Sequence, residues 1–184
     1  QKAIEYAEEK LPSESRTVPV WVGMAGAYRR TNNDQKALAA LKAAQKVNPS
    51  HPLIFMEYGD YYYWKKQYSD ALKNYQKSYL LNRTAAGAQG IALAAARIRD
   101  WDKARDAAES AVNLDSTMYE PRLILIDLYL KEKNYQLASS QLEYVVTRKP
   151  SDVKFWKQLS RCYDSTGNRE GLAGADARIV RSEE

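Results

Sequence analysis

The sequence has few of the residues from which metal, redox and acid–base sites are built. Its 184 residues include one cysteine, Cys162, and one histidine, His51. A single cysteine excludes an intramolecular disulfide framework and a cysteine-based zinc site. No glycine-rich phosphate loop, His-Glu-x-x-His motif or Ser/His/Asp set beyond the one histidine occurs. We therefore expect no metal, no cofactor and no enzymatic activity, with Cys162 as a small buried thiol and His51 in an exposed turn.

Glycine and proline are also scarce, with 8 and 6 residues. Their combined share is well below the roughly 12% of average proteins, which favours long regular elements. No uninterrupted apolar run approaches the roughly 18 residues that indicate a transmembrane helix. The composition therefore predicts a helical chain without direct membrane insertion.

Charge of one sign is not dominant either. The chain has 28 basic and 23 acidic residues, a net charge of +5. Basic and acidic residues are interspersed, as in segments 8–10, 100–103 and 131–133. Nucleic-acid-binding proteins usually gather Lys and Arg on one face, so we expect a solvated helical surface and no nucleic-acid partner.

What the sequence does contain is a repeated helical pattern. Trp21, Met24, Ala25 and Tyr28 are spaced i, i+3, i+4, i+7, which predicts one face of a helix. A polar break at 31–34 follows, and its Asn and Asp side chains suit the N-cap of a second helix.

The pattern recurs along the chain with a fixed period. One small or apolar residue marks the start of the second helix in every copy. These markers are Ala37, Ala71, Ala104, Ala138 and Leu172, and the intervals between successive markers are equal to within one position. Such a period predicts a stack of helical hairpins, because one hairpin cannot bury its apolar face alone.

The pattern resembles the tetratricopeptide repeat family, whose repeat is about 34 residues long. The first copy, from Trp21 to Pro49, matches the family at every marker. The fourth copy has Arg122 in place of the large residue, and the fifth is degenerate in its second helix. The resemblance implies an all-α fold, a right-handed α-solenoid of about five helix-turn-helix units with a leading half repeat.

The register divides the chain into one half repeat and five repeats. Because Ala3 precedes Ala37 by one such period, the start is expected to be the second helix of a truncated repeat, within a fragment of a larger protein. The expected units are 1–17 (second helix and linker), 18–51, 52–84, 85–118, 119–152 and 153–184, the last a degenerate repeat or C-terminal cap.

In the family, the first helices of the repeats line a concave face that binds partners. Carried over by repeat position, the resemblance implies apolar groups in the middle, carboxylates at Asp60 and Asp127, and basic groups toward both ends. The implied partner-binding residues are Arg29, Arg30, Met56, Asp60, Tyr63, Trp64, Gln89, Leu93, Arg97, Leu123, Asp127, Lys131, Lys157 and Arg161.

Two features of this face have a structural alternative. Met56, Tyr63 and Trp64 either line the groove or pack between repeats, although 61–64 are four consecutive aromatics, so at least one should be exposed or line the groove. Glycines within the first helices either make room for a ligand or permit close helix packing. The family's Lys/Asn clamp for a C-terminal carboxylate is missing, so a chaperone-tail receptor is not expected.

The resemblance implies a protein–protein interaction scaffold or adaptor that binds a peptide or protein partner. The alternative is an accessory segment of a larger bacterial envelope enzyme or of a secretion or polysaccharide export machine, where Tyr63 and Trp64 could stack on sugars. A bacterial periplasmic or envelope setting is weakly favoured, and a homodimer through the exposed terminal repeat surface is a further expectation.

Overall fold

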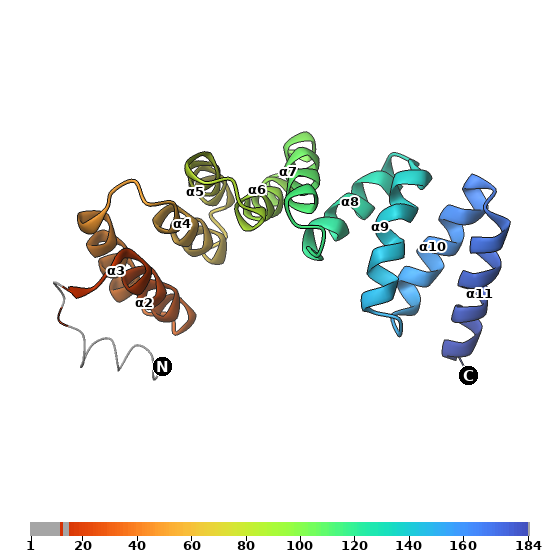
Figure 1. Cartoon of the computed structure of the whole chain (residues 1–184), viewed down its shortest axis with the longest axis horizontal. Coiled ribbons are helices and arrows are strands. Elements are labelled where there is room, and N and C mark those ends of the chain that lie inside the picture. Colours follow the sequence, from red (N-terminus) through yellow and green to blue (C-terminus); the bar gives the residue numbers. More distant parts are fainter. Residues whose placement is uncertain (1–11, 13–14, 184) are drawn as a thin grey trace.

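The computed structural model describes residues 12 and 15–183, and in this part of the chain all regular secondary structure is helical (Figure 1). The helices follow one another with short connections. They are α2 (Val18–Arg30), α3 (Asp34–Val47), α4 (Pro52–Trp64), α5 (Tyr68–Leu81), α6 (Ala85–Arg97), α7 (Trp101–Leu114), α8 (Glu120–Lys131), α9 (Tyr135–Arg148), α10 (Val153–Thr166) and α11 (Arg169–Glu183).

The helices pack as a linear array. Each one contacts its neighbours in sequence, and α2, α4, α6 and α8 also contact one another in series. Figure 1 shows the first and last described helices at opposite ends of the molecule. The all-α solenoid predicted from the period is therefore confirmed. The helix expected near the N-terminus falls on residues 1–11, which lie outside the described residues, and the limits assigned to individual repeats stay a prediction.

The turn inside each helix pair has one repeated backbone form. One residue of each turn lies in the left-handed region, with φ of 57° at Asn32, 60° at Lys66, 63° at Arg99, 58° at Lys133 and 73° at Gly167. The next N–H then reaches back to a carbonyl near the end of the first helix, as from Asn134 to Tyr129 at 2.8 Å. This hydrogen bond is that of the Schellman ending, which satisfies a helix carbonyl and reverses the chain.

The residue after the left-handed position immediately precedes the second helix of the pair. The side-chain oxygens of Asn33, Asp100 and Asn134 each accept a hydrogen bond from the backbone N–H three residues on. These are N-caps, which satisfy donors that the helix cannot. In the polar break after α2, the predicted N-cap of the second helix is therefore Asn33.

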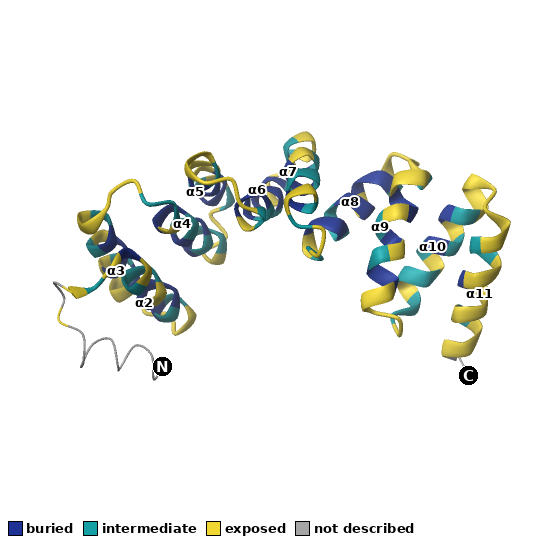
Figure 2. Ribbon diagram, in the orientation of Figure 1, coloured by how far each residue is buried: buried dark blue, intermediate teal, exposed yellow. Residues whose placement is uncertain are grey.

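The core runs along the lines where helices meet, and it is rich in alanine (Figure 2). The markers Ala37, Ala71, Ala104 and Ala138 are at most 1% exposed, while Leu172 is half-buried. Small side chains let the two helices of a pair approach closely, so each pair offers an apolar face that its neighbours cover. Cys162 is fully buried, as expected.

Two residues depart from the sequence interpretation. His51 is half-buried and is the N-cap of α4, where its Nδ1 accepts a hydrogen bond from the Leu53 N–H at 3.3 Å. Arg122 is buried and replaces the expected large residue by lying over the Tyr144 ring, 4.1 Å from its centroid. Burial lowers the pKa of Arg122. A long cation on an aromatic ring fills the volume that an indole would occupy.

The left-handed turn residues allow a direct test of this backbone form. Lys133→Gly should raise the free energy of unfolding by about 1 kcal/mol, because glycine adopts positive φ without the Cβ clash of other residues. Lys133→Ala, which removes the side chain but keeps the Cβ, should give no such gain. Urea denaturation of both variants measures the difference, and an equal effect of Ala and Gly would contradict the assigned geometry.

Candidate functional site

The residues predicted to bind a partner all belong to the first helices of the pairs or to the residues that end them. We call the surface formed by α2, α4, α6, α8 and α10 the first-helix face. In Figure 1 the array is arched, with α4 and α6 toward its inner side and α5 and α7 toward its outer side. The part of the first-helix face formed by α4 and α6 therefore lies on the inside of the arch.

At the N-terminal end of this face, α2 and α4 are joined by charged groups. Arg29 donates from Nε to Glu57 Oε1 at 2.8 Å and from Nη2 to Asp60 Oδ2 at 3.4 Å. The Arg29 and Glu57 side chains are only 15% and 11% exposed. Gly26 lies opposite, and a Cβ there would lie 3.0 Å from Glu57 Oε2, so this glycine permits close packing.

Tyr75 of α5 extends this network. Its hydroxyl donates to Asp60 Oδ1 at 2.8 Å. Its ring lies against Gly59 and Gly90, where a Cβ would lie 2.4 Å and 2.6 Å from ring atoms. The ring therefore fills space that only glycine leaves at both places. We did not predict Tyr75 as a site residue, although the repeat pattern marks its position in the second helix.

Burial governs the ionisation of the two carboxyl groups in this network. It raises the pKa of Glu57, and the Arg29 guanidinium only partly opposes the change. It also raises the pKa of Asp60, against the hydrogen bond from Tyr75 and the charge of Arg29. Burial together with the Asp60 carboxylate raises the pKa of the Tyr75 hydroxyl far above its ordinary value. These four side chains therefore connect neighbouring repeats, and two of them, Arg29 and Asp60, also belong to the predicted partner-binding surface.

Asp60 and Asp127 consequently differ, although they occupy equivalent repeat positions. Asp60 is held by Arg29 and Tyr75. Asp127 is exposed and forms no ion pair with any described residue. The shared surface role expected for this pair therefore has a structural counterpart only at Asp127.

The aromatic residues at the end of α4 are divided between packing and exposure. Met56 and Tyr63 are half-buried against the larger core, and Tyr61 is buried. Trp64 is 53% exposed, which confirms that the four consecutive aromatics cannot all be covered. The Tyr63 hydroxyl accepts a hydrogen bond from Arg97 Nε at 3.0 Å, joining α4 to the end of α6.

Farther along the face, apolar side chains alternate with polar ones. Gln89, Leu93 and Leu123 are half-buried, so each presents part of its surface to solvent. Lys131 is exposed, and its ammonium group lies 4.7 Å from the centroid of the Trp101 ring. Arg30, at the other end, is exposed.

A basic hollow of about 610 Å³ lies on α10. The predicted residues Lys157 and Arg161 line it, together with Val153, Lys154 and Gln158. The Oε1 atom of Gln158 is buried and accepts no hydrogen bond from any described residue. Their repeat positions could have identified them from the sequence, because all five residues lie along one side of α10.

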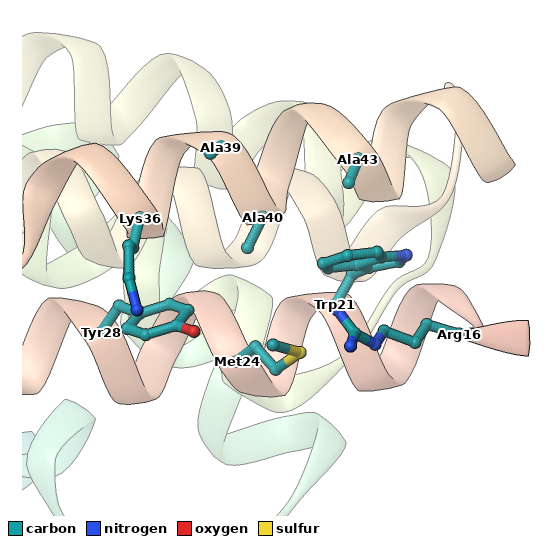
Figure 3. Close-up of a pocket in the computed structure, with 8 residues that line it drawn as sticks. All are labelled: Arg16, Trp21, Met24, Tyr28, Lys36, Ala39, Ala40 and Ala43. Carbon is teal, nitrogen blue, oxygen red and sulfur yellow. The ribbon is translucent and has the colours of Figure 1, made fainter. Parts of the chain in front are cut away.

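A second hollow, of about 250 Å³, lies at the N-terminal end of the described array (Figure 3). The Arg16 guanidinium lies 4.8 Å from the Trp21 ring centroid, and the Lys36 ammonium lies 5.2 Å from that of Tyr28. None of the predicted site residues lines this hollow; its walls are Arg16, Trp21, Met24, Tyr28, Lys36, Ala39, Ala40 and Ala43.

The described residues contain neither a metal-binding cluster nor a helix able to span a membrane. Nowhere in them do three or more His, Cys, Asp or Glu side chains gather as they would around a metal ion. None of the helices from α2 to α11 has the length and apolar character that crossing a membrane requires.

Comparisons with known proteins identify the fold. The family model of tetratricopeptide repeats matches residues 23–90. The crystal structure of MamA aligns with a TM-score of 0.72 at 18% identity, over 90% of this chain and 91% of that one. YrrB, described as a tetratricopeptide repeat protein with an unusual peptide-binding site, aligns with a TM-score of 0.73 at 17% identity, over 99% and 92%. PilF of Pseudomonas aeruginosa aligns with a TM-score of 0.75 at 15% identity, over 98% and 88%.

A search of curated proteins finds no match to the sequence. The repeat match at residues 23–90 and the alignments over nearly the whole chain agree on an array of tetratricopeptide repeats.

The raised pKa of Glu57 predicts how the free energy of unfolding depends on pH. A carboxyl group whose pKa is raised by folding binds more protons in the folded state, so its contribution to stability falls as the pH rises above the unfolded value. That ordinary value is 4.5 for Glu57. Glu57→Gln should therefore gain stability relative to the wild type between about pH 4.5 and pH 7.5. Urea denaturation at both pH values tests this, and a relative loss would mean that Arg29 outweighs burial.

Substitution of the two equivalent aspartates should separate a structural from a surface position. Asp60→Arg places a cation beside Arg29 and removes the acceptor of the Tyr75 hydroxyl, so we expect a loss of about 2 kcal/mol or more. Asp127→Arg should change stability by less than about 0.5 kcal/mol. Thermal unfolding of both variants measures this, and equal melting temperatures would show that the network is dispensable.

Proposed function

We propose that this chain is a protein-interaction scaffold built from tetratricopeptide repeats, since residues 23–90 match the model of that family and the fold is similar to those of MamA and YrrB. The first-helix face binds a peptide segment of a partner protein. The segment carries an acidic group that enters the basic hollow on α10, and its apolar side chains lie on α6 and α8.

The hollow on α10 is the observation that carries this proposal. Lys154 and Arg161 are both exposed and line it, so a carboxylate there gains two charge-assisted contacts. Gln158 Oε1 is a buried acceptor without a hydrogen bond from the described chain. A peptide N–H is the natural donor for such an atom, because an unsatisfied buried polar group costs free energy. The hollow thus suits a segment that offers an acid and a backbone amide together.

The apolar anchors come from two other first helices, α6 and α8. Leu93 on α6 and Leu123 on α8 are half-buried, so each has apolar surface left for a ligand to cover. Because α6 and α8 contact each other, these residues lie on adjacent elements of one surface. Apolar anchors beside a polar end are the usual arrangement for recognising a peptide in a groove.

One structural neighbour supports a peptide as the ligand. YrrB, which aligns over 99% of this chain, is described as having a peptide-binding site. At 17% identity, the similarity to YrrB shows the fold but not which residues bind a ligand. The choice of Lys154, Arg161 and Gln158 therefore rests on the hollow in this chain.

Selection from a phage-displayed library of random peptides tests the proposal. We expect the selected peptides to be enriched in Asp and Glu. Their affinity, measured by fluorescence anisotropy, should fall about tenfold or more in Lys154→Gln/Arg161→Gln, since a hydrogen bond to a charged group contributes about 1.5–3 kcal/mol.

The control is Lys42→Gln/Lys46→Gln, which makes the same change in charge on exposed residues of α3. It should bind the selected peptides as the wild type does. Peptides without acidic enrichment, or equal losses in both variants, would contradict a specific site on α10.

The wider setting stays a prediction of the sequence. That includes the accessory segment of a bacterial envelope enzyme or of a secretion or polysaccharide export machine, the periplasmic location and the homodimer. Stacking of sugars on Tyr63 also stays a prediction, with Trp64 the more exposed of the two rings.

A further inference from the structure

The turns inside the first four helix pairs lie side by side along one edge of the array. Lys65 of the second turn forms an ion pair with Asp34, which follows the first. Arg97, at the third turn, donates to the hydroxyl of Tyr63 at the second. Lys131, at the fourth, lies over the ring of Trp101 just after the third. We call this continuous row, formed by residues 30–34, 63–68, 97–102 and 131–134, the turn edge.

Each of the four turns presents at least one exposed cation that forms no ion pair with a described residue. These cations are Arg30, Lys66, Arg97, Arg99, Lys131 and Lys133. Lys66, Arg99 and Lys133 stand at the left-handed position of three successive turns, whereas Arg30 ends α2 just before the first turn, and the turns are exposed in Figure 2. The turn edge therefore carries positive charge at each of its four turns.

The backbone conformation at the left-handed turn positions does not favour lysine or arginine. Lys66, Arg99 and Lys133 all have positive φ, a conformation in which Gly or Asn is favoured over other residues. The first and fifth turns do use Asn32 and Gly167 at the same position. Three consecutive repeats thus accept a strained residue and gain a positive charge at the tip of the turn.

The carboxylates nearest these cations are mostly engaged by other basic groups. Asp34 is paired with Lys65, Asp100 with Lys103, and Glu132 with Arg105. Asp102 is exposed and offsets one charge. The turn edge therefore has an excess of positive charge, although acidic and basic residues are interspersed along the sequence.

Large apolar side chains stand among the cations. Trp64 is 53% exposed, Trp101 is 41% exposed and Ile98 is 39% exposed. Indole rings together with lysine and arginine are the composition of surfaces that settle in the headgroup region of a membrane. A single-stranded nucleic acid would need free ring faces for stacking, but Lys131 covers one face of Trp101 and Ile98 has no ring.

We propose that the turn edge adsorbs to an anionic lipid surface, with no helix crossing the bilayer. The cations of the four turns face the lipid headgroups, and the two indole rings with Ile98 enter the interfacial layer. The first-helix face, including the hollow on α10, stays available to a partner. This binding site goes beyond the proposed scaffold function and does not depend on it.

Co-sedimentation with vesicles tests the proposal. The wild-type chain should bind vesicles of phosphatidylcholine with phosphatidylserine and should not bind phosphatidylcholine alone. The test variant is Lys66→Asn/Arg99→Asn/Lys133→Asn, since Asn tolerates positive φ and the fold is kept. Its partition coefficient should fall about a hundredfold, about fivefold for each cation removed.

The matched control is Lys42→Gln/Lys46→Gln/Arg83→Gln, which removes three exposed cations away from the turn edge. It should bind the anionic vesicles within about threefold of the wild type, because charges beyond a Debye length of the surface contribute little. Equal losses in both variants, equal binding to neutral vesicles, or no vesicle binding would overturn the proposal. Retention of a single-stranded oligonucleotide without vesicle binding would instead indicate a nucleic-acid surface.

Discussion

The fold depends on one constraint, which is that no helix pair covers its own apolar face. Alanines such as Ala71 and Ala104 are fully buried, and each helix pair packs against the next along the array. Stability in such an array is approximately a sum of the stability of each pair and of the contacts between neighbours. Residues that join one pair to the next therefore matter more than their position on the surface indicates.

The network around Asp60 illustrates this constraint. Arg29, Glu57 and Asp60 lie on the first-helix face, yet they join α2 to α4, and Tyr75 continues the connection to α5. A charged group that is half-buried between repeats is expensive to leave unpaired. The charged groups in the N-terminal part of the first-helix face therefore stabilise contacts between helices. The polar atoms of the hollow on α10 remain available to a ligand.

The array has two surfaces with different chemistry. The first-helix face combines half-buried leucines with the basic hollow, which suits a peptide. The turn edge repeats an exposed cation at each of four successive turns and adds exposed indole rings. A repeated backbone unit produces both, because the same repeat position recurs on the same side of the array each time. A scaffold built in this way can hold a partner on one surface and a lipid bilayer on another.

The sequence alone determined the architecture, because the nearly constant spacing of markers from Ala37 to Leu172 reflects local geometry that repeats. It also located the N-cap at the first turn and the buried thiol of Cys162. Only the tertiary structure decided which equivalent residues share a role. Asp60 and Asp127 have the same repeat position but different neighbours, and Tyr75 reaches Asp60 through space that Gly59 and Gly90 leave open. Sequence spacing specifies the side on which a residue lies, whereas burial and charge pairing depend on side chains contributed by other repeats.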